Sequence, residues 1–471
     1  MAVKNSGGST FLAFAKSTGI FFVGNSMSKV ITLLLIPLYT NTLPSADYGY
    51  FDLSVTCATL LTSFLYCDIW SSVMRLMRDD LKGEAPWKVV ASGWVVFAGS
   101  TVLYIAIAIA LSCFFDVPSL GLIILYGVTT NIQSMFSGIA RGKGNNTDFA
   151  ASGVLCTVVN VGLNLLLILA FGIGYEALYV SYAAGFSAQC LFLFLRLDMR
   201  RHVSMPDVRQ VKELFAYSAP LGINSVAYWL LTSLSRVVVA STLSLAANGA
   251  FAIGSKFGST IALATTCFTL AWQDIAFTKE IRPGSFYSNA VTQYAGFLMS
   301  CTALLLPIIS LLFPVLVAGD YGDAYSVVPS FLWIAVVSAV STFIGNIFYV
   351  IKDTKTIGAT MAVSCIVNVV LVYPMTMGLG CVGANLSVLA AFVVNIAIRV
   401  FVLGRKIGLQ ISLSRCLLPF ALLVFCSAAY LLGGTASNLT ALCVSVAGLS
   451  FLYRSKASLL ASSLISKLRR R

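Results

Sequence analysis

Residues 89–112 read VVASGWVVFAGSTVLYIAIAIALS, which is a run of 24 residues without a charged side chain. A helix needs about 20 mostly apolar residues to cross the hydrocarbon core of a bilayer. The stretch therefore predicts a membrane-spanning helix. The whole chain has the same character, since 58% of its 471 residues are hydrophobic and only 10% are charged. A soluble protein of this size could not bury so much apolar surface, so the composition excludes a soluble enzyme.

Fourteen apolar stretches of this kind can be counted along the chain. They comprise residues 18–40, 48–73, 89–112, 120–140, 150–171, 177–195, 217–240, 249–271, 290–313, 327–350, 358–378, 383–403, 416–433 and 437–453. The loops between them are short, and the longest has 21 residues, at 196–216. No loop has room for a soluble domain. We therefore predict an all-α, polytopic membrane protein with about fourteen transmembrane helices.

Positive charge alternates from one predicted loop to the next. If the N-terminus lies inside, the inner loops and the two tails hold 26 of the 30 Lys and Arg residues, and the outer loops hold none. The outer loops contain acidic residues instead. This is the positive-inside pattern, and it predicts an even number of spans with both termini in the cytoplasm. It also assigns the net charge of +13 to contact with membrane lipids and excludes nucleic acid as a partner.

The two halves of the chain share a pattern of polar residues and glycines. The corresponding pairs are Asn25 with Asn224, Asn160 with Asn368, and Gly172 with Gly380. The last two pairs are each 208 residues apart. The segment PSADYGYF near the start of the first half also corresponds to LAANGAFA in the second. These pairs predict an internal repeat of six spans.

Because six is an even number, both copies of the repeat have the same orientation in the membrane. Parallel repeats are typical of two lobes that face each other around an axis along the membrane normal. We predict an N-terminal six-helix lobe at residues 1–216 and a C-terminal six-helix lobe at 217–403, around a central cavity. Two extra helices and a basic cytoplasmic tail follow at 404–471.

Charged side chains within the spans are candidate functional residues, because an ionisable group in the hydrocarbon costs on the order of 2.5–3.5 kcal/mol or more. From the helical rise per residue, Lys29 lies near mid-membrane, and Arg236 and Lys256 lie roughly 6 and 10 Å below the outer surface. We expect all three cations to line the cavity, although backbone carbonyls could satisfy Arg236 and Lys256. Arg399 lies four residues from the inner end of its span and is expected to snorkel to the surface.

Other polar residues within the spans are candidates for cavity or gating roles. Asp52 lies roughly 6 Å below the outer surface and could face the cavity, pair with Lys256 or lie at the interface. Asp68 precedes Arg75 by seven residues and so shares a face with it on a continuous helix, as a structural or gating pair. The amides considered for the cavity are Asn25, Asn160, Asn224 and Asn368. Some intramembrane amides are expected to bond between helices instead.

The sequence has few residues that suit catalysis or metal binding. The only histidine is His202, and none of the twelve cysteines forms a CxxC pair. The segment GAFAIGSK at Gly249–Lys256 has the glycines of a phosphate-binding loop, but it lacks the Lys-Ser/Thr ending and lies in a span. We therefore predict no catalytic residues, no metal site, no cofactor and no enzymatic activity.

Five short motifs resemble, in their order along the chain, the Wzx-type O-antigen and polysaccharide flippases. These motifs are DYGYFDL (Asp47–Leu53), CDIWSSVMR (Cys67–Arg75), SGIARGKG (Ser137–Gly144), APLGINS (Ala219–Ser225) and NGAFAIGSKF (Asn248–Phe257). These flippases belong to the multidrug/oligosaccharidyl-lipid/polysaccharide (MOP) exporter superfamily. The resemblance covers residues 10–455. The chain departs from the family in having Ser235 where an Asp often precedes the span-7 Arg, and in lacking a Gly after Asp68.

The resemblance implies a transporter that flips undecaprenyl-diphosphate-linked oligosaccharide from the cytoplasmic to the periplasmic leaflet of the bacterial inner membrane by alternating access. Cations in the cavity would attract the diphosphate, and by position these are Lys29, Arg236 and Lys256. The implied partners are the lipid-linked glycan, membrane lipids, H⁺ or Na⁺ as a coupling ion, and the polysaccharide polymerase with its chain-length machinery.

Three other functions remain open from the sequence. A cation-coupled multidrug exporter of the same superfamily needs buried acids, whereas the candidates here are mostly basic. A flippase for lipid-linked cell-wall precursors would use similar chemistry. A polymerase or glycosyltransferase needs catalytic groups in a large aqueous loop, but the longest outer loop, 314–326, has thirteen residues and its two Asp residues suit a turn.

Overall fold

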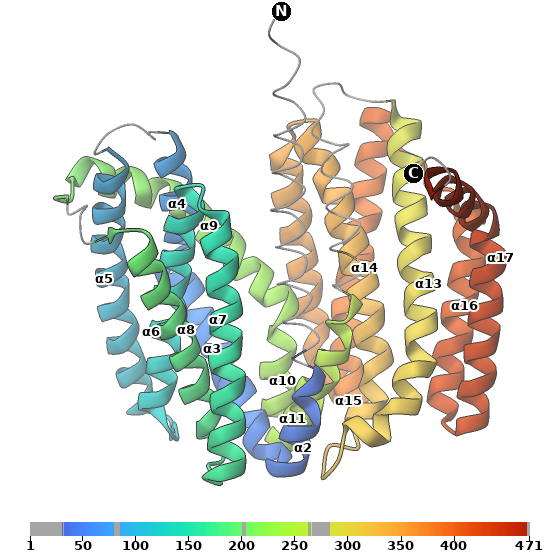
Figure 1. Cartoon of the computed structure of the whole chain (residues 1–471), viewed down its shortest axis with the longest axis horizontal. Helices are drawn as coiled ribbons and strands as arrows, with labels where there is room; N and C mark the ends of the chain where they lie inside the picture. Colours follow the sequence, from blue (N-terminus) through green and yellow to red (C-terminus); the bar gives the residue numbers. More distant parts are fainter. Residues whose placement is uncertain are drawn as a thin grey trace, which may run out of the picture. The chain divides into compact units, whose positions relative to one another are not determined.

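The computed structural model describes residues 31, 33–79, 85–199, 204–261, 265 and 283–468. Within these ranges the chain is helical and no residue forms a β-strand, which confirms the all-α class. Up to residue 258 the elements are α2 (Ile36–Thr42), α3 (Ser45–Tyr66), α4 (Ile69–Asp79), α5 (Ala85–Ser112), α6 (Leu120–Gly142), α7 (Asn146–Leu165), the π-helix η1 (Leu166–Ala170), α8 (Glu176–Arg196), α9 (Val208–Thr232), α10 (Leu234–Thr242) and α11 (Leu245–Gly258). From residue 284 they are α13 (Gly284–Leu316), α14 (Ala324–Val350), α15 (Thr354–Ile407), α16 (Leu413–Leu432) and α17 (Thr435–Leu468) (Figure 1).

The helices pack into two compact units. The first unit comprises Met1–Ala252, Gly319–Tyr321 and Met361–Val388. The second comprises Ile253–Ala318, Gly322–Thr360 and Leu389–Arg471. The lobe boundaries after residues 216 and 403 therefore stay a prediction.

Nine helices among the described residues are long and apolar enough to cross a membrane. Two further spans are counted if each of two bent helix pairs is one crossing, namely α3 with α4, bent by 46°, and α9 with α10, bent by 44°. The total of fourteen stays a prediction, because most of the predicted span 18–40 and part of 249–271 lie outside the described residues.

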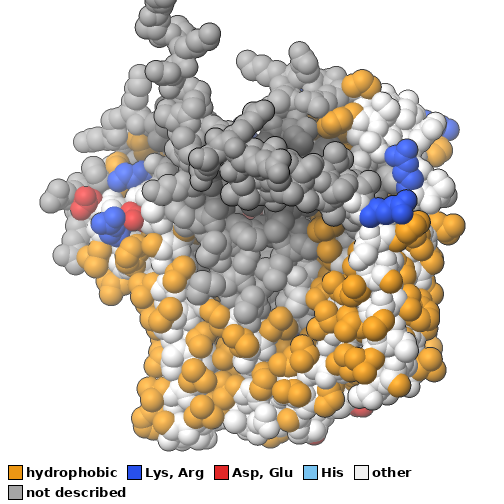
Figure 2. Space-filling view, turned by 45° about the vertical axis from the view of Figure 1, so that its right-hand side comes forward, with side chains coloured by type: hydrophobic (Ala, Val, Ile, Leu, Met, Phe, Trp, Pro, Cys, Tyr) orange, Lys and Arg blue, Asp and Glu red, His pale blue; other side chains and the backbone are white. Residues whose placement is uncertain are grey.

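Large apolar side chains lie on the outside of the helices. Phe64, Val102, Phe171 and Ile223 are each more than 60% exposed. Figure 2 shows hydrophobic side chains over a broad band of the visible face, with the Lys and Arg side chains gathered above it. Water would make such a surface an aggregation site, whereas lipid chains solvate it. The exposed apolar band therefore supports a multi-pass membrane protein.

The 54 residues of α15 form a hairpin of two helical arms. A straight helix of that length would be about 80 Å long, yet Lys406 Nζ near its end lies 2.5 Å from Oδ2 of Asp353, which caps its start. The chain reverses at Gly380, whose φ of 60° and ψ of −145° suit glycine. Hydrogen bonds from Lys406 and then Thr356 lower the pKa of Asp353 to about 2. The two arms correspond to the separate spans predicted at 358–378 and 383–403.

One helix-end motif recurs 208 residues further along the chain. α6 ends with a hydrogen bond from Asn145 N to Ala140 O, of 2.9 Å. α14 ends with the same bond, from Asp353 N to Phe348 O, also of 2.9 Å. Such a bond belongs to the Schellman motif that terminates helices. Both donor residues also cap the following helix with their side chains.

The backbone conformation repeats at the same offset. Gly144 and Lys352, which directly precede the two capping residues, both have positive φ. Gly172 and Gly380 at the opposite ends of the following helices have φ of 64° and 60°. The internal repeat predicted from the sequence is therefore visible in the local structure.

Arg399 in the second unit is only 3% exposed, so the expectation that it snorkels to the surface is wrong. Its Nε donates to Thr360 Oγ1 at 3.0 Å, and its Nη1 donates to Ser341 O at 2.7 Å. Gly345 makes room for the guanidinium, because a Cβ there would lie 2.9 Å from Nη1. Arg399 remains inside because acceptors on α14 and the first arm of α15 surround its guanidinium.

We predict that Arg399→Ala lowers the free energy of unfolding by about 3 kcal/mol, because it leaves buried acceptors without a donor. Denaturant unfolding of the detergent-solubilised protein measures this value. The control is Arg405→Ala, which removes an exposed cation from the same helix arm and should change stability by about 0.5 kcal/mol or less. Equal effects of the two substitutions would contradict a structural role for Arg399.

Candidate functional site

The first turns of α3 and α11 cross at two glycines within the first unit. A Cβ on Gly49 would lie 1.8 Å from Leu245 O, and a Cβ on Gly249 would lie 2.0 Å from Ser45 O. The contact is reciprocal, and each residue of one helix corresponds to a residue 200 positions later in the other. The starts of α3 and α11 are therefore related by a local two-fold axis. Small residues allow membrane helices to approach this closely.

Polar contacts fix the crossing. Asn248 Nδ2 donates to Gly49 O at 2.8 Å. The carboxylate of Asp320 accepts from Ser45 N at 3.1 Å and also from the Ser45 hydroxyl. Tyr321 donates its hydroxyl proton to the carbonyl of Leu43, at 3.0 Å. The short segment Gly319–Tyr321 thus fastens the start of α3, and its acid lies at the positive end of that helix.

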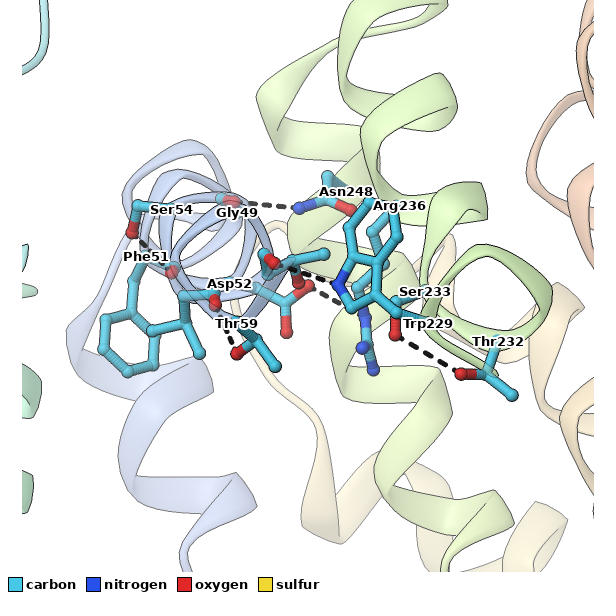
Figure 3. A network of polar contacts seen from close by, with 12 residues as sticks. Gly49, Phe51, Asp52, Ser54, Thr59, Trp229, Thr232, Ser233, Arg236 and Asn248 are labelled. Carbon is cyan, nitrogen blue, oxygen red and sulfur yellow. Dashed lines mark hydrogen bonds and ion pairs between the residues drawn. The ribbon is translucent and has the colours of Figure 1, made fainter. Parts of the chain in front are cut away.

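An ion pair lies beside this crossing. Asp52 on α3 places Oδ2 3.0 Å from Nε of Arg236 on α10 (Figure 3). Their side chains are 15% and 27% exposed, respectively. The sequence places both residues roughly 6 Å below the outer surface, and the structure brings them together. Position 235, where the similar flippases often have an Asp, holds the buried Ser235, whose hydroxyl donates to Ala384 O. The acid beside Arg236 is instead Asp52 of α3.

The bend between α9 and α10 sets the direction of Arg236. α9 ends at Thr232, and Ser233 N bonds back to Trp229 O. The indole nitrogen of Trp229 donates to Thr56 O at 3.0 Å, which ties α9 to α3. α10 then begins at Leu234, after a change of direction of 44°. Arg236 thus lies in the first turn of a new helix that is directed toward α3.

Asn368 stabilises that bend. Its Nδ2 donates to Leu230 O at 2.9 Å and to Leu231 O at 3.2 Å. Its Oδ1 accepts from the hydroxyl of Ser387. The side chain is completely buried. The structure therefore gives Asn368 the helix-bonding role expected for some of the intramembrane amides, and does not place it on an open surface.

Asp68 and Arg75 do not pair, and the expectation of a shared helix face is wrong for them. Cys67 and Asp68 have φ of 48° and 55°, which interrupts the helix between α3 and α4. The seven-residue spacing assumed a continuous helix. Arg75 is exposed and lies over the ring of Tyr217 on α9, 5.4 Å from its centroid. Asp68 remains half-buried at the bend.

The remaining candidate residues among those described lie on α7, α9 and α11. Asn160 accepts a hydrogen bond from Asn164 Nδ2 within α7, at 2.8 Å. Asn224 is exposed on α9. Lys256 is half-buried on the part of α11 that belongs to the second unit. Lys29 and Asn25 lie outside the described residues.

The sequence did not predict two contacts of this site, the crossing at Gly49 and Gly249 and the bond between Asp320 and Ser45. The correspondence of PSADYGYF with LAANGAFA had already placed Gly49 and Gly249 in register, and this was the available signal for their contact. Asp320 was interpreted as part of a turn, and its bond to Ser45 had no sequence signal, because 275 residues separate the two.

The arrangement suits the reversible binding of an anion. A guanidinium presents five donors in a planar fork that matches carboxylate or phosphate oxygens. In this structure Asp52 occupies one side of that fork, and the Arg236 side chain retains some exposure. An anion that displaced the carboxylate would form an ion pair with the guanidinium and could accept charge-assisted hydrogen bonds from it.

These features define the class of the protein as a multi-pass membrane protein with an intramembrane ion pair. A family model described as "Polysaccharide biosynthesis protein" matches residues 14–272. This match spans more than half of the 471 residues, and the chain therefore belongs to that family. No curated protein matches the chain in sequence.

Solved structures of one superfamily share the fold. The lipid II flippase MurJ, in an inward closed conformation, aligns with a TM-score of 0.73 over 93% of this chain and 100% of its own, at 15% identity. An inward-facing multidrug resistance transporter of the MATE family aligns with a TM-score of 0.59 over 80% and 97%, at 16% identity. A MOP superfamily transporter from Pyrococcus furiosus gives 0.51 over 83% and 95%, at 14% identity. The chain thus has the fold of the MOP superfamily, which confirms the resemblance found in its sequence.

We predict that Gly49→Val separates α3 from α11 and lowers the melting temperature of the purified protein. Overpacking of this kind costs about 1–3 kcal/mol, because the new side chain meets backbone that cannot yield. Gly162→Val is the matched control, since a Cβ at this α7 position would meet nothing within 4 Å. If both variants melted at the same temperature, the close crossing would be disproved.

Proposed function

We propose that the protein flips undecaprenyl-diphosphate-linked oligosaccharides, such as O-antigen or related polysaccharide repeat units, from the cytoplasmic to the periplasmic leaflet of the bacterial inner membrane. The single observation that carries the proposal is Arg236, a partly exposed cation within a span that forms an ion pair with Asp52 beside the crossing of α3 and α11. Membership in the polysaccharide biosynthesis family supports a lipid-linked glycan as the cargo.

The physical problem is to move a diphosphate through about 30 Å of hydrocarbon. A bare charge in that medium is very costly, so a cation along the path lowers the barrier. Arg236 would bind the diphosphate, with Lys29 and Lys256 as further candidates. The lipid tail can remain in the bilayer because only the headgroup has to cross.

Asp52 has a defined role in this proposal. An intramembrane Arg without a counter-ion would be unstable between transport cycles. Asp52 neutralises Arg236 when the cargo is absent, and the diphosphate displaces Asp52 when it arrives. The exchange replaces one ion pair with another, so the guanidinium is never left without an anion.

The crossing of α3 and α11 would close the outer side while the headgroup is loaded. Both helices begin at ends that the predicted orientation places in the periplasm. Release of the headgroup would then require Gly49 and Gly249 to separate. An H⁺ or Na⁺ gradient could drive this step, and the polysaccharide polymerase with its chain-length machinery would consume the exported units.

Two related functions make different use of the same fold. A multidrug exporter needs an acid that is available to a cationic drug, whereas Asp52 already pairs with Arg236. A flippase for lipid-linked cell-wall precursors carries the same diphosphate. The fold shared with the lipid II flippase gives this alternative specific support, and only the identity of the cargo separates it from the proposal.

The proposal predicts the state of lipid-linked glycans in cells without the protein. Finished repeat units should accumulate and stay inaccessible to a membrane-impermeant label applied to spheroplasts. Arg236→Ala should reduce labelling by about tenfold or more at unchanged protein level, because a charge-assisted contact is lost. Arg236→Lys should restore part of it, and the exposed control Arg209→Ala should behave as the wild type.

Other outcomes of this experiment are equally informative. Units that accumulate but are fully accessible outside would place the defect after translocation and favour a polymerase-like role. Normal pools of lipid-linked glycan with altered drug susceptibility would favour the multidrug exporter. Accumulation of cell-wall precursors would identify the other flippase.

A further inference from the structure

The second unit contains a polar pocket that is separate from the Asp52–Arg236 pair. Its volume is about 630 Å³. It lies between the first turns of α13 and the segment that connects α15 to α16. Its polar lining includes Ser285, Ser288, Asn289, Thr292, Gln410 and Arg415.

Backbone contacts fix the shape of this pocket. A Cβ on Gly284 would lie 1.8 Å from Ile407 O, so the start of α13 is pressed against the end of α15. Gln410 N donates to Ser288 Oγ at 2.9 Å, and Ser412 N donates to the hydroxyl of Thr292 at 3.3 Å. The connecting segment is thus held along α13 by hydrogen bonds.

The pocket carries the positive charge of Arg415. Arg415 Nη1 donates to Asn289 Oδ1 at 2.8 Å, and this amide is neutral. Among the described residues, the ion pairs that the structure forms do not include Arg415. Beyond Asp353 the chain contains eleven Lys and Arg residues and no Asp or Glu. A guanidinium oriented by an amide and surrounded by hydroxyl groups is suited to the oxygens of a phosphate ester.

An apolar surface continues from the pocket along α16. Leu418 and Phe425 follow Arg415 by three and ten residues, so they lie within a quarter turn of it on this helix, and they are 40% and 45% exposed. The connecting segment belongs to a loop that the charge pattern places on the cytoplasmic side. A polar, cationic pocket next to exposed apolar side chains is the arrangement that a lipid headgroup and its acyl chains require.

We propose that this pocket binds the phosphate ester of an anionic membrane lipid in the cytoplasmic leaflet, with the acyl chains lying along α16. Arg415 and Asn289 hold the phosphate. The site is independent of the transport cycle proposed above, and it requires neither Arg236 nor a sugar. Its lipid is either an ordinary anionic phospholipid or a polyprenyl phosphate, and both present the same chemical group.

Native mass spectrometry of the full-length protein, delipidated and titrated with phosphatidylglycerol, tests the proposal. Wild-type protein should retain the lipid in preference to phosphatidylcholine. Arg415→Gln should weaken binding by about tenfold, because one charge-assisted contact is lost, and Asn289→Ala should weaken it by less. The matched control Arg405→Gln removes an exposed cation of the neighbouring helix end that does not line the pocket, and should leave the affinity unchanged.

Two further titrations identify the source of the phosphate. Tighter binding of undecaprenyl phosphate than of phosphatidylglycerol would support the site and assign it to the carrier lipid, whereas the reverse order would assign it to a phospholipid. Inorganic phosphate that competes fully at equal concentration would overturn the lipid proposal. Equal loss of binding in Arg415→Gln and Arg405→Gln would also overturn it, because general surface charge would then explain the effect.

Discussion

The ion pair between Asp52 and Arg236 is the interaction on which the rest of the candidate site depends. A charge within a membrane span is tolerated only when a partner neutralises it or water reaches it. This requirement explains why α10 begins at a bend that directs Arg236 to α3, and why Trp229 and Asn368 stabilise that bend. The hydrogen bonds of Trp229 and Asn368 thus keep Asp52 on α3 next to Arg236 on α10.

The internal repeat gives this pair its position near the crossing of α3 and α11. Gly49 and Gly249 occupy equivalent positions in the two copies, and each glycine contacts the start of the other helix. A contact of this symmetry can open by separation of two similar elements, without unfolding either one. In the proposed mechanism the crossing separates and the ion pair exchanges its anion, and the fold places these two elements side by side.

Much of the fold could be predicted from the sequence, because the bilayer imposes length and apolarity on each helix. The reversal at Gly380 and the 208-residue repeat were both visible as patterns. The partner of Asp52 was not, since depth along a helix can be estimated but direction around it cannot. The left-handed Cys67 and Asp68 carry no glycine or proline signal, so the bend that separates Asp68 from Arg75 was missed. The burial of Arg399 depends on acceptors from other helices.

The central claim is that Asp52 and a diphosphate compete for Arg236. The most direct test is the affinity for undecaprenyl diphosphate of the purified protein in nanodiscs, compared with Asp52→Asn and Arg236→Gln at matched thermal stability. The account predicts changes of opposite sign: Asp52→Asn binds the diphosphate more tightly than the wild type, and Arg236→Gln binds it more weakly. If both substitutions weakened binding equally, or neither changed it, the pair would be purely structural and the claim would be contradicted.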